Sequence, residues 1–252
     1  MTTKHFLFIA AVLAAFAAHA QQGKLVTYQI DNEAYEGYYT QPSGEKADKA
    51  PLVLVLHDWD GLTDYEIKRA DMLAQEGYQV FAADLFGKGI RPTENKDKAQ
   101  HTGELYKDRE KLRRLMTGAI DAAKKQGAAT DNVAAMGYCF GGAAALELAR
   151  SGAALQGFAS FHGGLGTPPG QSYAQTKGKV IIFHGTADTA ITMNDFANLA
   201  NELEAAQIPH EMITYGGAPH SFTVFSSPAY REKEDKQSWK RFLKFLQEAF
   251  SS

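Results

Sequence analysis

A cysteine framed by glycines is the part of this sequence best suited to chemistry. Residues Gly137 to Gly141 read Gly-Tyr-Cys-Phe-Gly and centre on Cys139. An apolar run at 133–138 precedes this pattern and an alanine- and leucine-rich stretch at 141–150 follows it. A strand is therefore expected to enter the pattern and a helix to leave it. This context predicts a nucleophile elbow, a sharp strand-to-helix turn, with cysteine in place of serine.

The same turn would make the thiol reactive. Glycine is required on both sides because a side chain two positions from the nucleophile would collide with neighbouring backbone. The helix that follows directs its partial positive charge at Cys139 and favours the thiolate. The alternative is a buried, inert cysteine that packs as a small hydrophobe. The strand before Cys139 and the helix after it favour the catalytic interpretation.

An acid and a histidine follow Cys139 in the order that an elbow requires. Asp188 comes after the apolar run at 180–183, and His220 comes after a strand-like run at 210–215. Loops that follow parallel strands meet at the carboxyl edge of an open sheet, so the three side chains are expected to converge there. In this hypothesis His220 takes the thiol proton, and Asp188 fixes the imidazole tautomer and stabilises the imidazolium.

Other histidines and acids near these turns have simpler roles open to them. His184 ends a strand, where a buried structural imidazole is the expected role. His57 and His162 also end apolar runs and are candidates to line a pocket. Asp195 falls in the first turn of an expected helix, where an acid caps the helix or favours its dipole. Asp84 is placed to bind the backbone of its own loop.

An oxyanion hole needs two backbone N–H donors. The sequence predicts one at Phe140, directly after the nucleophile, and one in the loop after the apolar run at 51–56. Trp59 is the predicted donor in that loop. The alternative for Trp59 is a side chain that only packs over the site.

The elements that must position these residues alternate along the chain. Short apolar β-branched runs, turns rich in Gly, Asp and Pro, and longer amphipathic stretches predict parallel strands joined by crossover helices. Expected strands, the first two forming an antiparallel hairpin, cover 25–30, 35–40, 51–56, 78–83, 133–138, 155–161, 180–183 and 210–215. Expected helices cover 64–76, one or two segments within 87–126, then 141–150, 194–206 and 231–250. The predicted fold class is α/β, with a mostly parallel central sheet of about seven to eight strands flanked by helices.

The first twenty residues have the pattern of a signal peptide. Lys4 supplies a positive start, residues 6–16 are almost wholly apolar, and residues 18–20 (Ala-His-Ala) have the small-x-small pattern of a cleavage site. An uncleaved membrane anchor is the alternative, but a spanning helix needs about 20 apolar residues. We therefore expect residues 1–20 to be removed, residues 21–252 to form one domain, and the mature protein to be periplasmic or secreted.

The charge and the cysteine content limit which binding partners and which disulfides are expected. The formal net charge is −3, and without Lys4 there are 25 basic against 29 acidic residues, a net charge of −4. This balance gives no reason to expect nucleic acid or an anionic membrane as partner. Cys139 is the one cysteine of the sequence, so no disulfide can form within the chain.

The sequence resembles the dienelactone hydrolase family of α/β-hydrolases over nearly the whole length after the signal. The resemblance rests on the motifs HDWDGL at 57–62, GY at 77–78, ADLFG at 83–87, GYCFGG at 137–142, HGTAD at 184–188, PHSF at 219–222 and DKQSW at 235–239. It implies an α/β-hydrolase fold, a triad of Cys139, Asp188 and His220, and no metal or organic cofactor.

The resemblance also implies further site residues, with two departures from the family pattern. An auxiliary carboxylate, usually Glu, holds the resting thiol, and the matching residue here is the shorter Asp58. Members that act on dienelactone itself are expected to bind its carboxylate with two arginines, and the matching neighbourhoods here offer Lys88 and Val224. Lys88 is thus a candidate substrate-binding residue, with a solvated loop lysine as the alternative. The loss of one positive charge argues against dienelactone as the natural substrate.

The function predicted from the sequence is hydrolysis of a carboxylic ester or lactone through a thioester on Cys139. Alternatives that use the same triad are acyl transfer and thiol-dependent peptidase activity, and a non-enzymatic alternative is a small-molecule binding protein on a hydrolase fold. A redox sensor ranks last because the chain has no resolving cysteine. The expected partner is a small ester or lactone, and the expected state is a monomer or weak dimer.

Overall fold

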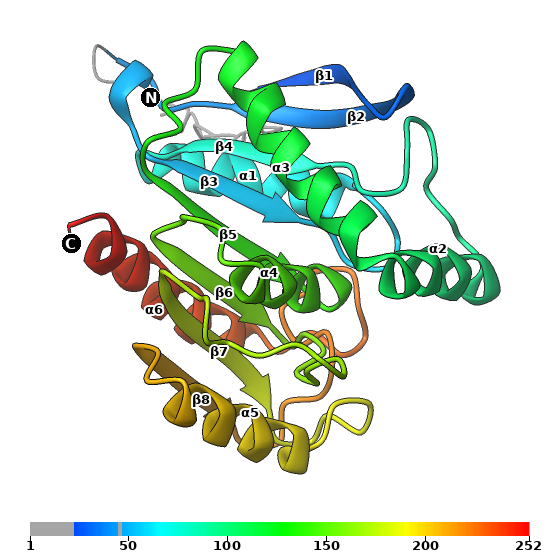
Figure 1. The fold of residues 1–252 in the computed structure, drawn as a ribbon, viewed down its shortest axis with the longest axis vertical. Coiled ribbons are helices and arrows are strands. Elements are labelled where there is room, and N and C mark those ends of the chain that lie inside the picture. The colour runs from blue at the N-terminus through cyan, green and yellow to red at the C-terminus, as the bar shows by residue number, and fades with distance from the viewer. Residues whose placement is uncertain (1–22, 45–46, 252) are drawn as a thin grey trace, which may run out of the picture.

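Eight strands form one sheet in the order β1-β2-β4-β3-β5-β6-β7-β8 (Figure 1). The structure is a computed structural model that describes residues 23–44 and 47–251. The strands are β1 Lys24–Ile30, β2 Glu33–Thr40, β3 Leu52–Leu56, β4 Gln79–Ala83, β5 Val133–Tyr138, β6 Gly157–Phe161, β7 Lys179–Gly185 and β8 His210–Tyr215. The predicted signal peptide lies outside the described residues. Each strand expected from the sequence is present, and the α/β prediction is confirmed.

The sheet is parallel from β4 through β8 and antiparallel at its β1 edge. β1 and β2 form a hairpin whose turn residues, Asp31 and Asn32, both have positive φ, the geometry that two-residue hairpin turns require. β2 then pairs antiparallel with β4. β3 and β5 lie side by side near the middle, and all five residues of β3 are buried. Strands covered on both faces are expected to be continuously apolar, as β3 is.

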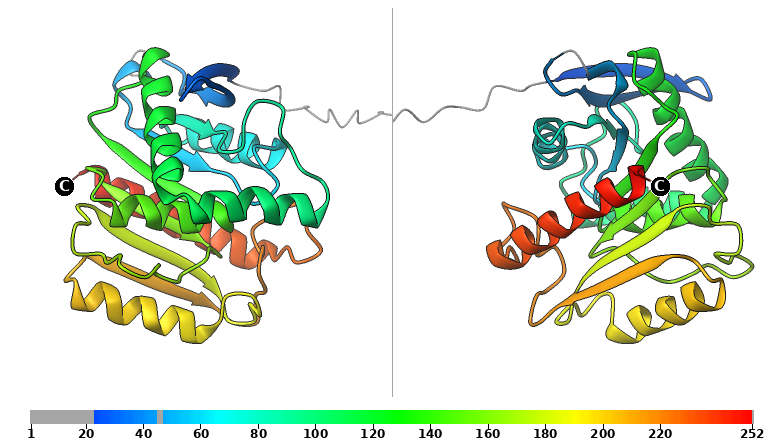
Figure 2. Two further views of the ribbon diagram at one scale, coloured as in Figure 1. Left: turned by 45° about the vertical axis from the view of Figure 1, so that its right-hand side comes forward. Right: turned by 90° about the vertical axis from the view of Figure 1, so that its left-hand side faces the viewer.

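The described residues contain six α-helices, of which three cover one face of the sheet and two cover the other (Figure 2). They are α1 Asp64–Gln75, α2 Asn95–Lys107, α3 Arg109–Lys125, α4 Phe140–Arg150, α5 Met193–Ala205 and α6 Glu232–Phe250. Apolar residues of α3, α4 and α5 share one core cluster, and those of α1 and α6 share the other. The sixth helix, α2, lies toward the carboxyl edge of the sheet. The sheet is therefore enclosed on both faces, and its carboxyl edge is left for loops and α2.

The stretch at 87–126, where one or two helices were expected, contains two. Asp108 separates them: it ends α2, and its carboxylate accepts the N–H of Lys111 at 2.8 Å and so caps α3. In the described part of the chain, no helix combines the length and the apolar character needed to cross a membrane.

Candidate active site

Cys139 occupies a strained turn between β5 and α4. Its φ is +50°, a conformation that few residues other than glycine adopt. A Cβ on Gly137 would lie 2.2 Å from the carbonyl carbon of Gly141, and a Cβ on Gly141 would lie 2.1 Å from the carbonyl oxygen of Leu56. Both glycines are thus required by close backbone contact. The predicted elbow is present, and the thiol is partly exposed at the start of α4.

Three side chains that are far apart in sequence form one hydrogen-bonded line. Nε2 of His220 lies 3.1 Å from Sγ of Cys139, and Nδ1 of the same ring lies 2.7 Å from Oδ2 of Asp188. The other carboxylate oxygen of Asp188 accepts the N–H groups of Ala190 and Ile191, both at 2.9 Å. Because Asp188 is fixed by its own loop, it can hold the imidazole with Nδ1 protonated and Nε2 toward the sulfur.

The loops that carry the acid and the imidazole are joined backbone to backbone. The N–H of Ala187 donates to the carbonyl of Ala218 at 3.0 Å, and the N–H of Thr186 donates to the carbonyl of Tyr215 at 3.0 Å. Gly185 allows this approach, since a Cβ there would lie 2.2 Å from the carbonyl oxygen of Ala218. The spacing between acid and base is therefore set by main-chain contacts between the β7 and β8 ends.

The environment favours a charged imidazolium and a charged carboxylate. Burial opposes the positive charge on His220, but its bonds to Asp188 and to Cys139, together with the charges of those groups, raise its pKa to about 10. Burial likewise opposes the negative charge of Asp188, but its bond to His220 and the N–H of Ile191 hold its pKa below the ordinary value. The imidazole is thus suited to receive a proton from the thiol.

Asp58, the predicted auxiliary carboxylate, lies near the triad but does not bind the thiol in this structure. Its Oδ1 accepts the N–H of Asp60 at 2.8 Å, and the hydrogen-bond partner of the Cys139 sulfur is His220. Burial raises the pKa of Asp58, and burial together with the charge of Asp58 raises the pKa of Glu66 behind it. The role of Asp58 as a switch for the resting thiol stays a prediction.

The two residues predicted as oxyanion donors lie at the elbow and in the loop after β3. Phe140 begins α4, so its backbone N–H is one of the free donors of that helix N-terminus. Trp59 is 37 % exposed in the loop after β3. Tyr106 of α2 packs its ring edge on Phe140 at 5.4 Å, and burial and the charge of Cys139 raise its pKa. The assignment of Phe140 and Trp59 to an oxyanion hole stays a prediction, and Tyr106 is a neighbour of the sulfur that the sequence did not reveal.

Lys88, the predicted substrate-binding cation, contacts the β1–β2 hairpin. Its ammonium lies 2.9 Å from Oγ1 of Thr27 and 3.1 Å from Oε2 of Glu36. None of its described contacts joins it to the triad. Two other cations lie at the loop after β3. Lys98 of α2 lies 2.7 Å from Oδ1 of Asp60 and 5.3 Å from the ring centroid of Trp59, and the guanidinium of Arg91 donates to the carbonyl of Leu62. The position of Lys88 directly after the 83–87 motif suggested a substrate-binding role. The chain leaves β4 in a direction that places Lys88 against the hairpin instead.

The residues given structural roles in the sequence occupy them. Asp195 forms a capping box with Thr192 at the start of α5, and Asp84 accepts the N–H groups of Phe86 and Gly87 at 3.1 Å each. His184 is buried within β7 and stacks on Phe196, but neither of its ring nitrogens has a hydrogen-bond partner among the described residues.

The two histidines that were candidates to line a pocket are both buried. His57 accepts the N–H of Leu85 through Nε2 at 3.1 Å, which ties the β3 and β4 ends together. His162 lies against the ring of His220, with the two ring centroids 5.3 Å apart.

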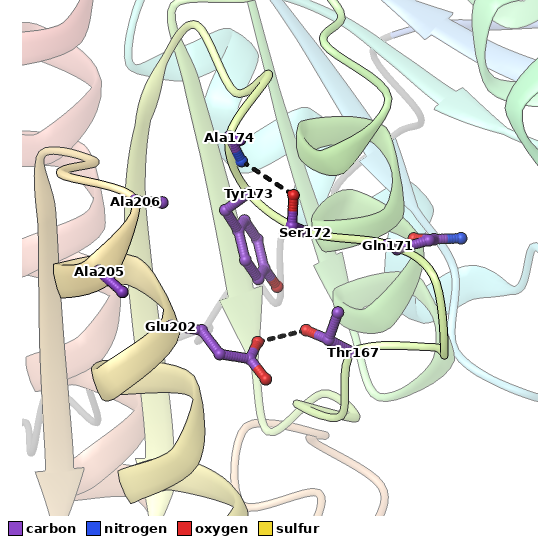
Figure 3. A pocket seen from close by; sticks show the side chains of 8 residues that line it. All are labelled: Thr167, Gln171, Ser172, Tyr173, Ala174, Glu202, Ala205 and Ala206. Carbon is purple, nitrogen blue, oxygen red and sulfur yellow. Dashed lines mark hydrogen bonds between the residues drawn. The ribbon is translucent and has the colours of Figure 1, made fainter.

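A cavity of about 330 Å³ lies elsewhere, between α5 and the loop that follows β6 (Figure 3). Figure 3 shows Glu202 of α5 and Thr167 of the loop hydrogen-bonded to each other across it. No triad residue lines this cavity. Within residues 23–44 and 47–251, no group of three or more His, Cys, Asp or Glu side chains could hold a metal ion.

Comparison with known proteins identifies the family. The family model for the dienelactone hydrolase family matches residues 35–250. The chain belongs to the dienelactone hydrolase family. It is 28% identical over 210 residues to a carboxymethylenebutenolidase of a Pseudomonas species, with 79% of this chain and 84% of that protein covered.

Solved structures of this family superpose on the whole domain. A dienelactone hydrolase-like promiscuous phosphotriesterase from metagenomic libraries has a TM-score of 0.80 and 28% identity, with 90% of this chain and 98% of that chain covered. A structure described as m3DLH has a TM-score of 0.81 and 30% identity over the same shares. The fold and the family together make this chain a dienelactone hydrolase-like hydrolase of esters or lactones.

Proposed function

We propose that this protein hydrolyses a carboxylic ester or lactone through a thioester intermediate on Cys139. The observation that supports this most directly is the unbroken line from Sγ of Cys139 through both nitrogens of His220 to Asp188, at 3.1 and 2.7 Å. A nucleophile within reach of its base, with the base oriented by an acid, is the arrangement that covalent acyl transfer requires.

In the first half-reaction the Cys139 thiolate attacks the carbonyl carbon while His220 carries the thiol proton. The tetrahedral oxyanion would be held by the N–H of Phe140 and of Trp59. As the C–O bond breaks, His220 gives its proton to the departing alkoxide. The alcohol leaves, or in a lactone stays attached to the acyl chain, and the acyl group remains as a thioester.

In the second half-reaction the neutral imidazole of His220 takes a proton from water. The hydroxide formed attacks the thioester carbon, the C–S bond breaks, and the carboxylic acid is released. Asp188 stabilises the imidazolium in both halves without accepting the proton. The sum is ester plus water giving acid plus alcohol, and Cys139 is returned.

The first experiment measures turnover of small aryl esters and of unsaturated lactones by wild type and by Cys139→Ala. We expect wild-type turnover and a loss of about a thousandfold or more in kcat for the variant, since removal of a nucleophile leaves only binding and oxyanion stabilisation. Mass spectrometry of an acid-quenched reaction is expected to show the acyl group on the peptide that contains Cys139. Wild-type rates in the variant would refute the proposal.

Product analysis separates this function from its rivals. Ester or amide products formed from added alcohols or amines would indicate acyl transfer by the same triad, and cleavage of peptide amides would indicate peptidase activity. If no ester or lactone of the panel is hydrolysed and iodoacetamide labels Cys139 slowly at neutral pH, the protein would be a binding protein.

Phosphotriester hydrolysis is a second candidate activity, favoured by the likeness to the promiscuous phosphotriesterase at 28% identity and TM-score 0.80. Here the thiolate would attack phosphorus, the P–O bond to the aryl group would break, and the aryloxide would leave with the proton held by His220. The neutral imidazole would then take a proton from water, and the hydroxide would break the S–P bond and release the dialkyl phosphate. A diethyl aryl phosphotriester added to the panel tests this. Stoichiometric release of aryloxide without turnover would show that water fails to break the S–P bond.

We also propose that the protein is exported, with cleavage after Ala20, and that the mature domain binds its small substrate without nucleic acid or membrane. The support is the sequence pattern of residues 1–20. Expression of the full chain, fractionation and N-terminal sequencing test it. A protein that stays in the cytoplasm with residues 1–20 attached would refute the proposal.

A further inference from the structure

A buried polar cluster lies behind the imidazole of His220 and contacts the loop that carries it. We call this cluster the Thr223 clamp; its members are Tyr65 and Arg69 of α1, His162 at the end of β6, Thr223 itself, and Asp235 of α6. Residues Arg69, His162, Thr223 and Asp235 are at most 4 % exposed. These residues come from four separate segments of the chain.

Thr223, three residues after His220, is the point at which the clamp holds the loop. Its hydroxyl lies 2.8 Å from Nε2 of His162 and 2.8 Å from the phenol oxygen of Tyr65. Its carbonyl accepts the Nη2 of Arg69 at 2.9 Å and the hydroxyl of Tyr65 at 3.2 Å. Both polar groups of Thr223 are thus engaged by α1, which lies on the same face of the sheet as α6.

Arg69 is itself fixed, so it offers a rigid anchor. It forms a buried ion pair with Asp235, whose second oxygen accepts the hydroxyl of Tyr230 at 3.1 Å. The guanidinium also lies 4.3 Å from the ring centroid of Phe225 and 5.0 Å from that of Trp239. A guanidinium with this many partners has few alternative positions, because each would leave a buried charge unpaired.

His162 extends the clamp to the catalytic ring. Its imidazole meets that of His220 edge to face, with centroids 5.3 Å apart and planes at 67°. Its φ is +40°, and its Nδ1 has no hydrogen-bond partner among the described residues. Strained backbone and an unpartnered buried nitrogen both cost free energy, and they persist only where the surroundings enforce them.

We propose that the Thr223 clamp positions His220, so that the imidazole keeps one orientation toward Cys139 while its protonation state changes. His220 must give and take a proton in each turnover, and Asp188 restrains only the Nδ1 side of the ring. The clamp supplies the second restraint, by fixing the chain three residues later and by placing His162 against the ring face. Tyr65, Arg69, His162, Thr223 and Asp235 are positioning residues in this inference, which rests on the proposed function.

The charge state of the clamp agrees with this role. Burial and the positive charge of His220 hold the pKa of His162 well below its ordinary value, so His162 stays neutral beside a charged neighbour. The other ionisable groups that face His162 are Asp188, Arg69 and Tyr138. A neutral His162 can restrain His220 without competing for its proton.

The test uses two substitutions that remove one oxygen each and keep side-chain shape. Thr223→Val removes the hydroxyl that binds His162, and Tyr65→Phe removes the phenol oxygen that binds Thr223. The matched controls are Thr176→Val and Tyr173→Phe, which break hydrogen bonds at 3.0 Å to the Ala149 carbonyl and at 2.7 Å to Arg150. For each variant we measure kcat, KM and Tm, and the rate of iodoacetamide alkylation of Cys139 at pH 7.

We expect both clamp variants to lower kcat about tenfold with KM changed less than about twofold, because a transition-state interaction weakens while binding is kept. Alkylation should slow by a similar factor, because a misplaced imidazole stabilises the thiolate less well. The controls should keep both rates even where their Tm falls. Unchanged kcat and alkylation rates in Thr223→Val and Tyr65→Phe, at whatever Tm, would overturn the proposal.

The alkylation measurement needs no substrate, so it separates the clamp from the proposed function. If wild type hydrolyses no ester but the clamp variants still slow alkylation, the positioning inference holds and the assigned reaction fails. If the clamp variants alkylate at the wild-type rate, the inference fails even where ester hydrolysis is observed.

Discussion

Two clusters in this molecule each surround a buried carboxylate with hydrogen-bond donors, and they differ in whether a reactive side chain is present. The triad corner joins Cys139, His220 and Asp188 at the carboxyl edge of the sheet. The second, the Glu147 cluster, joins Glu147 and Arg150 of α4 with Arg109 and Arg113 of α3 and with Gln171. In each, a carboxylate that is fully buried is surrounded by donors.

The Glu147 cluster holds its one carboxylate among three arginines and has no reactive member. The Glu147 carboxylate accepts from Arg113 at 2.8 Å, from Arg150 at 3.0 Å and from Gln171 at 3.0 Å. Burial opposes its charge, but the bonds from Arg150 and Arg113 hold its pKa below the ordinary value. Guanidinium groups neither give up a proton nor act as nucleophiles near neutral pH. The cluster can only hold α3, α4 and the loop after β6 together.

The triad corner combines a partly exposed nucleophile, a base that can change protonation state and a strained backbone. The difference teaches that a buried carboxylate with a lowered pKa does not by itself mark an active site. Access for substrate and a partner whose protonation can change are what distinguish the two clusters.

Substitution of the triad acid should give the largest effect. In Asp188→Asn the amide can no longer favour the Nδ1-protonated imidazole, so we expect kcat to fall by about a hundred- to ten-thousandfold. Steady-state kinetics on the best ester of the panel measure this, and circular dichroism checks that the fold is kept. A fall in kcat of less than about tenfold would mean that Asp188, like Glu147, contributes to stability and not to catalysis.

The matching change in the Glu147 cluster should act on stability alone. Glu147→Ala leaves Arg150, which is 2 % exposed, buried without its carboxylate, and breaking a buried pair costs about 3–5 kcal/mol. Chemical denaturation at pH 7 is expected to show this loss with kcat unchanged in the folded fraction. A fall in kcat there would remove the distinction between the clusters.

The two clusters should also weaken at opposite ends of the pH range. The pKa of His220 is raised from 6.5 to about 10, so its contribution to the free energy of unfolding is complete below about pH 6.5 and is lost as pH rises through 10. The pKa of Glu147 is lowered, so its contribution is complete above its ordinary value of 4.5 and is lost as pH falls.

Denaturation of wild type, His220→Gln and Glu147→Ala at pH 4, 6.5 and 10 tests this. The stability gap between wild type and His220→Gln should narrow at pH 10, and the gap for Glu147→Ala should narrow at pH 4. If the differences in free energy of unfolding between wild type and the two variants stayed constant with pH, the charges of His220 and Glu147 would not contribute to stability as inferred.

Removal of Lys88 should give the smallest effect. Its pairing with Glu36 is exposed, and such pairs contribute about 0–1 kcal/mol, so Lys88→Ala is expected to lower stability by no more than that. Because the ammonium contacts the hairpin and not the triad, KM for anionic esters should change less than about twofold. A KM that rises tenfold for anionic substrates alone would restore Lys88 as a substrate-binding residue.

The parts of the fold that could be predicted are those encoded by residues close together in the sequence. The apolar run at 51–56 could be recognised as a buried strand, and β3 occupies Leu52–Leu56. Gly137 and Gly141 could be recognised as an elbow because the steric reason is local to five residues, and their close contacts confirm it. The direction of Lys88 could not be predicted, since it depends on how the chain leaves β4 relative to the β1–β2 hairpin, whose Thr27 lies 61 residues earlier.

The sequence by itself predicted the succession of strands and helices along the chain, the nucleophile elbow and the three residues proposed as the triad, because strand and helix periodicities and turn chemistry are local properties. Only the tertiary structure decided which groups contact these residues. In it, the Cys139 thiol is within hydrogen-bond distance of His220 and not of Asp58, and Thr223 forms hydrogen bonds with side chains of α1. These contacts join residues up to 166 positions apart, as in the pair of Arg69 and Asp235. Contacts of that kind are set by the packing of helices onto the sheet, and no local pattern encodes them.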